Sequence, residues 1–159
     1  MSENIFDQKP DQPLFMAVKS KDPAFADAIE QAQRSLSVFR RLLSETMHSP
    51  AHGGIRMVKT FISEGNESMW LWLKLEADMA DGFVASVFEA PPQFRSLKTG
   101  TMKAIKDAGV ADWAIIDNEG HVHGGFSLRL ARSRLPENER TSYDAHIGAK
   151  SYAPLPASD

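Results

Sequence analysis

Residues 67–78, ESMWLWLKLEAD, alternate between apolar and other side chains. A period of two is typical of a β-strand that places one face on the core. The apolar face, which we expect to be buried, consists of Met69, Leu71, Leu73 and Leu75. The opposite face carries Trp70, Trp72, Lys74 and Glu76. Two tryptophans therefore lie on the side that would meet water if the C-terminal helices do not fold over it.

The chain before this strand has a helical pattern. Asp22 is suited to cap a helix, and Pro23 suits its first position, where the missing N–H costs nothing. Apolar residues then recur at spacings of three and four, at Phe25, Ala28, Ile29, Ala32, Leu36, Phe39 and Leu43. The spacing predicts one amphipathic helix of about six turns.

Strand patterns follow the helix. They cover residues 55–63, 67–77, 83–90 and 112–117. The first two flank the short connection EGN and are expected to pair as an antiparallel hairpin. Near the C-terminus, apolar residues return to helical spacing, and Pro136 is expected to start a second short helix.

These elements predict an α+β fold. We expect an antiparallel sheet of about five strands covered by one long N-terminal helix, with short C-terminal helices. The expected domain organisation is a flexible N-terminal arm over residues 1–20, a single domain over 21–148 and a disordered tail over 149–159.

Composition narrows the function classes. The net charge of −3 over 159 residues gives no electrostatic reason to expect a nucleic acid or a membrane as partner. The absence of cysteine excludes disulfides, a thiolate nucleophile and cysteine-ligated metals. The N-terminus lacks a signal-peptide pattern, and no apolar run approaches the ~18 residues of a membrane span. We therefore expect a cytoplasmic protein.

Motifs for catalysis are also missing from the sequence. It contains no G-x-S-x-G elbow and no glycine-rich nucleotide motif. His121 and His123 are two residues apart, but two ligands do not make a metal site. We expect neither a metal nor a cofactor. The arginines near the C-terminus are interleaved with Glu137 and Glu139, which favours a solvated helix face over a phosphate or nucleic-acid site.

Four stretches of the chain, taken in order over about residues 22–144, resemble the bacterial family called domain of unknown function 2314. The most specific elements are the E-x-M-W of Glu67, Met69 and Trp70, the D-W of Asp112 and Trp113, and the G-G-[FY]-[ST]-x-R of Gly124 to Arg129. The resemblance implies a shared fold and a small cytosolic bacterial protein; some relatives resemble immunity proteins of toxin systems. Ser68, Ala85, Glu89 and Thr101 depart from the family pattern, so the resemblance implies no catalytic residue.

We expect a protein-binding module without enzymatic activity. Its partner would be a toxin, neutralised by an immunity-type protein, or a second copy of the chain in a homodimer. The candidate binding residues are Trp70, Trp72, Lys74, Glu67, Asp112 and Arg129. Tryptophan and arginine are favoured at interface hot spots. The resemblance favours Trp70 as a fixed part of the fold, packed under the C-terminal helices, and Trp72 as the surface that a partner covers.

The alternative is a small-molecule-binding or hydrolytic domain. Its cleft would be built from Glu67, Asp112 and Arg129 if the sheet brings them together.

Overall fold

The structure is a computed structural model that describes residues 22–46 and 54–156, so the expected N-terminal arm lies outside the described residues. Its strands are β1 (Gly54–Glu64), β2 (Glu67–Met79), β3 (Gly82–Val87), β4 (Met102–Lys106), β5 (Asp112–Asp117), β6 (His121–Gly124) and β7 (Ser151–Tyr152). They form one sheet in the order β4-β3-β2-β1-β5-β6-β7, in which only β6 and β7 pair in parallel. The α+β class is confirmed, and the sheet has seven strands rather than about five.

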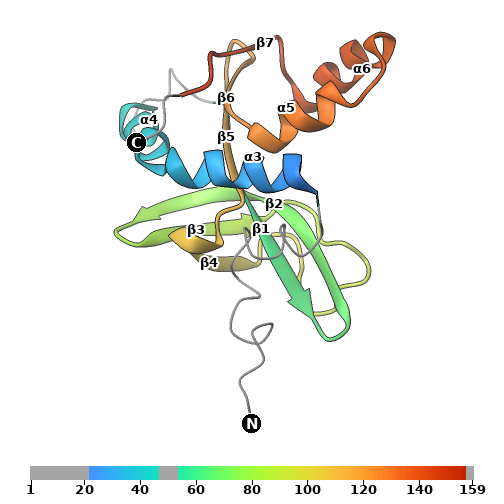
Figure 1. The fold of residues 1–159 in the computed structure, drawn as a ribbon. Helices are drawn as coiled ribbons and strands as arrows, with labels where there is room; N and C mark the ends of the chain where they lie inside the picture. The colour runs from blue at the N-terminus through green and yellow to red at the C-terminus, as the bar shows by residue number, and fades with distance from the viewer. Residues whose placement is uncertain (1–21, 47–53, 157–159) are drawn as a thin grey trace.

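Four α-helices accompany the sheet within the described ranges: α3 (Pro23–Arg34), α4 (Leu36–Thr46), α5 (Phe126–Ser133) and α6 (Glu137–Ile147). A 3-10 turn, η2 (Asp107–Gly109), precedes β5. In Figure 1, α3 lies between the β1–β4 part of the sheet and α5. None of the helices in these ranges has the length and apolar character needed to cross a membrane.

The prediction of a single long N-terminal helix is wrong, because Ser35 separates α3 from α4. The Ser35 hydroxyl donates to the carbonyl of Gln31 at 2.8 Å, and its backbone φ of −112° leaves the helical range. The same oxygen accepts the indole N–H of Trp113 at 3.0 Å. The break therefore provides a buried acceptor for a distant tryptophan, and the apolar spacing continues across it undisturbed.

The predicted apolar face of β2 lies on the core. Leu73 and Leu75 are buried, and Met69 and Leu71 pack against the same cluster. This cluster also takes the buried residues of α3 and α4, namely Ala28, Ala32, Leu36, Phe39 and Leu43. The apolar face of β2 and the apolar faces of α3 and α4 thus meet in one core, as the patterns predict.

Trp113 on β5 joins the sheet to the helices. Its side chain is fully buried and stacks on Phe39 with ring centroids 4.9 Å apart. The backbone at Gly124 passes directly over this ring: φ is +70°, and a Cβ there would lie 2.5 Å from the indole. Only glycine accommodates both the left-handed conformation and the close approach.

The disordered tail expected beyond Gly148 is wrong at Ser151–Tyr152, which form β7. Val122 pairs with Tyr152 in parallel register, and Ala149 is buried. The Tyr152 hydroxyl donates to Asp144 of α6 at 2.7 Å. These contacts depend on partners from other elements, which a short Ala- and Pro-rich segment does not indicate by its own pattern.

The contact between Gly124 and Trp113 predicts a specific loss of stability. Gly148 is the control, because it also has a positive φ but has open space around it. Gly148→Ala should lower the free energy of unfolding by about 1–2 kcal/mol. Gly124→Ala adds a backbone clash with Trp113 and should cost roughly 3 kcal/mol or more. Urea unfolding of the two variants measures the difference; equal losses would show that the close approach is unimportant.

Candidate functional site

Asp112, a candidate binding residue, is completely buried at the start of β5. Its Oδ1 accepts the backbone N–H groups of Trp113 and Phe126 at 2.8 and 3.1 Å. Its Oδ2 accepts the backbone N–H of Ser127 at 2.7 Å and the Ser127 hydroxyl at 2.5 Å. The first N–H groups of α5 lack helical partners, and a negative charge is favourable beside them. The carboxylate therefore caps α5 and ties it to β5.

The charge of Asp112 is balanced by a neighbouring lysine. Lys59 lies opposite Asp112 in the β1–β5 ladder, and its ammonium donates to the Ser127 hydroxyl at 3.3 Å. Burial raises the pKa of Asp112 to about 6, against the effect of the Ser127 bonds and the Lys59 charge. Burial also lowers the pKa of Lys59, and the Asp112 charge opposes that shift. At pH 7 Asp112 stays ionised, as its four donors require.

Arg129 does not bond to Asp112. Its guanidinium donates to the carbonyls of Gly124 at 2.8 Å and Val122 at 3.2 Å. Glu67 lies exposed on the β1–β2 hairpin, where it lines a shallow hollow with Glu64, Gly65, Pro92, Gln93 and Arg95. Arg129 lines a different hollow, between α5 and α6. The structure thus separates Glu67 from Arg129, and the carboxylate of Asp112 is engaged by the fold, so the predicted cleft does not form.

Trp70 and Trp72 are both half-buried. Trp70 makes edge contacts with Phe25 of α3 and Phe61 of β1, with centroid distances of 5.1 and 5.0 Å. Its packing under the C-terminal helices is wrong, because these aromatic contacts come from the N-terminal helix and the neighbouring strand. Trp72 lies opposite Lys59, whose ammonium is 5.8 Å from the indole ring centroid. The aromatic surface is therefore smaller than the alternation predicted, and Lys74 remains exposed beside it.

The two histidines of β6 are held by hydrogen bonds. His123 lies 3.2 Å from Asp117, and the ring of His121 contacts the Ser151 hydroxyl. The part of the chain that the structure describes contains no group of three or more side chains arranged to hold a metal ion.

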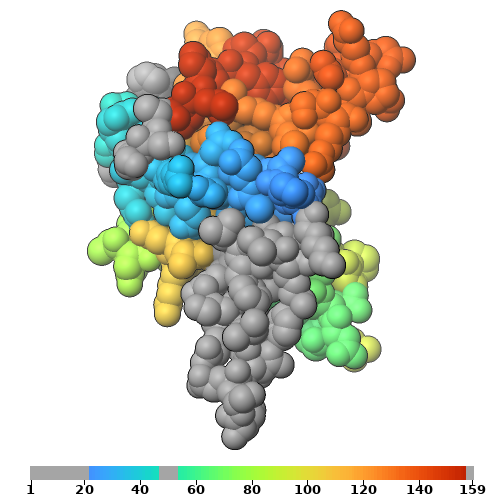
Figure 2. All heavy atoms as spheres, in the orientation of Figure 1, coloured from blue at the N-terminus to red at the C-terminus, as the bar shows by residue number. Residues whose placement is uncertain are grey.

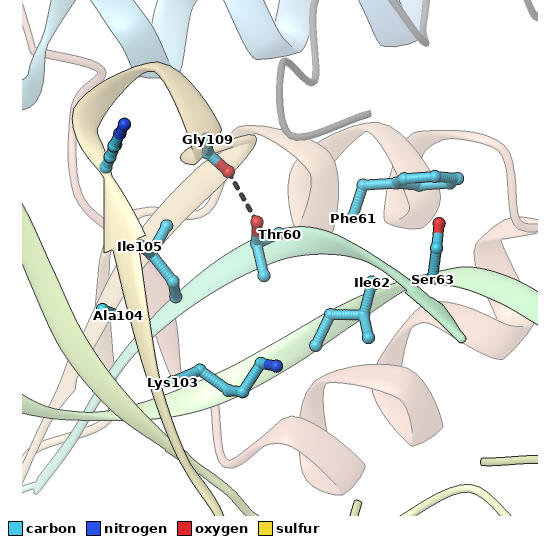
Figure 3. Close-up of a pocket in the computed structure, with 9 residues that line it drawn as sticks. Thr60, Phe61, Ile62, Ser63, Lys103, Ala104, Ile105 and Gly109 are labelled. Atoms are coloured by element: carbon cyan, nitrogen blue, oxygen red, sulfur yellow. Dashed lines mark hydrogen bonds between the residues drawn. The ribbon is translucent and has the colours of Figure 1, made fainter. Parts of the chain in front are cut away.

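A hollow of about 240 Å³ lies between β1 and β4. We call it the edge hollow, and it is lined by Thr60, Phe61, Ile62, Ser63, Lys103, Ala104, Ile105, Lys106 and Gly109. Figure 3 shows Ile105 and Lys103 on one side of it and Thr60 and Ile62 on the other. Thr60 is held by a hydrogen bond from its hydroxyl to the Gly109 carbonyl at 2.7 Å. Sequence patterns identified β1 but neither β4 nor the space between the two strands.

Both strands present a free backbone edge to this hollow, as far as the described residues show. β4 is the terminal strand of the sheet, and β1 pairs with β5 only as far as Lys59. The Lys59 carbonyl accepts the Ala111 N–H on the β5 side, so alternation points the backbone groups of Phe61 and Ser63 to the same side.

The orientation of the β4 edge follows in the same way. Thr101 and Asp107 form backbone bonds on the β3 side of this strand. Because backbone groups alternate along an antiparallel pair, those of Ala104 and Lys106 point away from β3. No strand among the described residues pairs with them. The sequence signal for an unpaired edge is the inequality of the two predicted strands, which cover residues 55–63 and 112–117.

A family model matches most of the chain. The model of the family described as "Uncharacterized protein conserved in bacteria (DUF2314)" matches residues 22–150. No curated protein and no solved structure matches the chain. The elements through which the chain resembles this family include Asp112, Trp113 and the segment from Gly124 to Arg129, which meet at the junction of β5, β6 and α5.

The raised pKa of Asp112 predicts a pH-dependent stability. Below about pH 4 the carboxyl is protonated in both the folded and the unfolded chain, and its contribution to the free energy of unfolding is fully present. This contribution is lost as the pH rises through about 6. Between these limits the wild type should lose about 3 kcal/mol relative to Asp112→Asn. Urea unfolding at several pH values measures this gap, with Asp81→Asn as the control for an exposed carboxylate. A gap independent of pH contradicts the assignment.

Proposed function

The chain belongs to the family described as "Uncharacterized protein conserved in bacteria (DUF2314)", and on that premise we propose that it acts in the cytoplasm by binding another protein rather than by catalysis. The edge hollow is the binding element. An extended segment of the partner adds to the sheet there and forms main-chain hydrogen bonds with β1 or β4. The observation that carries this proposal is the pair of free strand edges beside one hollow.

The backbone at these edges supports strand addition. An unpaired row of N–H and C=O groups is a template for another strand, and proteins normally cover or charge such edges. Here Phe61 and Ser63 lie on one edge, and Ala104 and Lys106 on the other. Ile62 and Ile105, both largely buried, line the hollow with apolar groups.

The charge of the edge hollow supports an acidic partner segment. Lys103 and Lys106 line it, and none of its lining residues is a carboxylate. An extended segment that carries Asp or Glu beside apolar residues would complement both features. The occupant we propose is such a segment of a different protein.

The half-buried aromatics extend this surface. Phe61 both lines the edge hollow and contacts Trp70. Trp72 follows two residues later on β2 and points to the same face. Large aromatic side chains near the centre of an interface contribute most to binding energy. We therefore include Trp72 in the proposed binding surface.

The arrangement around Asp112 supports binding over catalysis. A catalytic carboxylate must reach a substrate, whereas all four donors around Asp112 belong to the fold and the side chain is completely buried. Stoichiometric binding is the way in which an immunity-type protein neutralises a bacterial toxin, and this is the role we propose for the partner interaction.

The proposal predicts which edge substitutions prevent binding. Tagged full-length chain is used to capture a partner from the native host, and the identified partner is then purified and titrated by calorimetry. Ala104→Pro removes an outward N–H without breaking the β3–β4 ladder, and should weaken binding about tenfold or more. Lys106→Glu should weaken it similarly, because it reverses the charge at the hollow.

Lys150→Glu is the matched control, since Lys150 is also an exposed lysine and lies outside the edge hollow. It should bind the partner as the wild type does. A partner that binds Ala104→Pro and Lys106→Glu with unchanged affinity contradicts the proposal, as does failure to capture any protein sensitive to these substitutions. Light scattering that shows a dimer lost in Ala104→Pro would identify a second copy of the chain as the occupant instead.

A further inference from the structure

A second hollow, of about 280 Å³, is lined by Arg129, Arg132, Ser133, Arg140 and Tyr152. We call it the arginine hollow. α5, α6 and β7 contribute its residues, and Figure 2 shows these elements, in orange and red, gathered at one end of the molecule. The expectation of a solvated helix face is wrong here, because all three arginines are half-buried and held by hydrogen bonds.

Each guanidinium is fixed through its Nε and one terminal nitrogen. Arg132 donates to both carboxylate oxygens of Asp144 at 2.8 and 3.0 Å. Arg140 donates to the carbonyls of Leu135 and Ser133 at 3.2 and 3.3 Å. Arg129 is held by two backbone carbonyls in the same manner. Within residues 22–46 and 54–156, the second terminal nitrogen of each arginine has no hydrogen-bond partner.

The arginine hollow carries excess positive charge. Three guanidinium groups meet one carboxylate, that of Asp144, which also accepts the Tyr152 hydroxyl. The Tyr152 ring lies 5.5 Å from the Arg129 guanidinium and 5.1 Å from that of Arg132. Burial lowers the pKa of Arg129, with no carboxylate bonded to it. An anion in this hollow would pair with the guanidinium groups that lack a carboxylate partner in the described part of the chain, those of Arg129 and Arg140.

We propose that the arginine hollow binds a phosphate monoester. Such a group carries a charge near −2 and three strong acceptor oxygens, and three arginines each have donors to spare there. The planar guanidinium groups are already oriented by the protein, so little side-chain entropy is lost on binding. A small phosphorylated metabolite and a phosphorylated serine of a partner share this chemistry. The inference rests on residues outside the edge hollow and does not depend on the proposed function.

Calorimetric titration of the full-length protein tests the site. The probes are phenyl phosphate, inorganic phosphate, N-acetyl-phosphoserine amide and, as the carboxylate comparison, benzoate. Phenyl phosphate or the phosphoserine compound should bind once per chain and more tightly than benzoate. The tighter of the two identifies the source of the phosphate. Arg140→Gln removes one donor group and should weaken binding about tenfold.

Arg134→Gln is the matched control. Arg134 also lies near the end of α5 but bonds to Asp22 outside the hollow, so its loss should change the affinity less than about twofold. Ser133→Glu is a second variant, in which an exposed residue of the hollow gains a negative charge and should abolish binding without unfolding the chain. No saturable phosphate binding, equal binding of benzoate, or equal loss in Arg134→Gln overturns the proposal.

Discussion

The second half of the fold depends on the hydrogen bonds that the buried carboxylate of Asp112 accepts from the start of α5. Asp112 accepts the first N–H groups of α5 and lies at the start of β5, so one side chain fixes how the chain passes from β6 into α5. Trp113, the next residue, carries this constraint to the N-terminal helices through Ser35 and Phe39. Gly124 then permits the backbone to pass over the indole. The positive charge of Lys59 compensates the buried negative charge of Asp112.

This role of Asp112 changes the meaning of the family resemblance. Its most specific elements in the second half of the chain, D-W and G-G-F-S-x-R, meet at one junction and form hydrogen bonds with each other. They specify how α5 joins the sheet. The binding surfaces that we propose lie elsewhere, at the free edges of β1 and β4 and at the guanidinium groups between α5 and α6. A fold-defining centre and separate recognition surfaces are compatible, because rigid elements position both.

Local sequence patterns predicted the elements in which apolar residues recur regularly along one face. The alternation of β2 and the three-and-four spacing before it identified the buried leucines and the helical residues. They failed where one distant side chain decides the geometry. Ser35, at the end of α3, accepts the indole N–H of Trp113, and β7 pairs in parallel with β6 at Val122. Neither influence is visible within a window of a few residues.

Predicted site residues fared differently for the same reason. Asp112 and Arg129 were predicted as binding residues, but in the structure they bond mainly to backbone groups brought close by folding. Hydrogen exchange of the Ser127 amide tests the central claim most directly. In Asp112→Asn, the amide of Ser127 should lose at least about tenfold of its protection, while that of the buried Leu73 on β2 keeps its own. Undiminished protection of Ser127 would contradict the account.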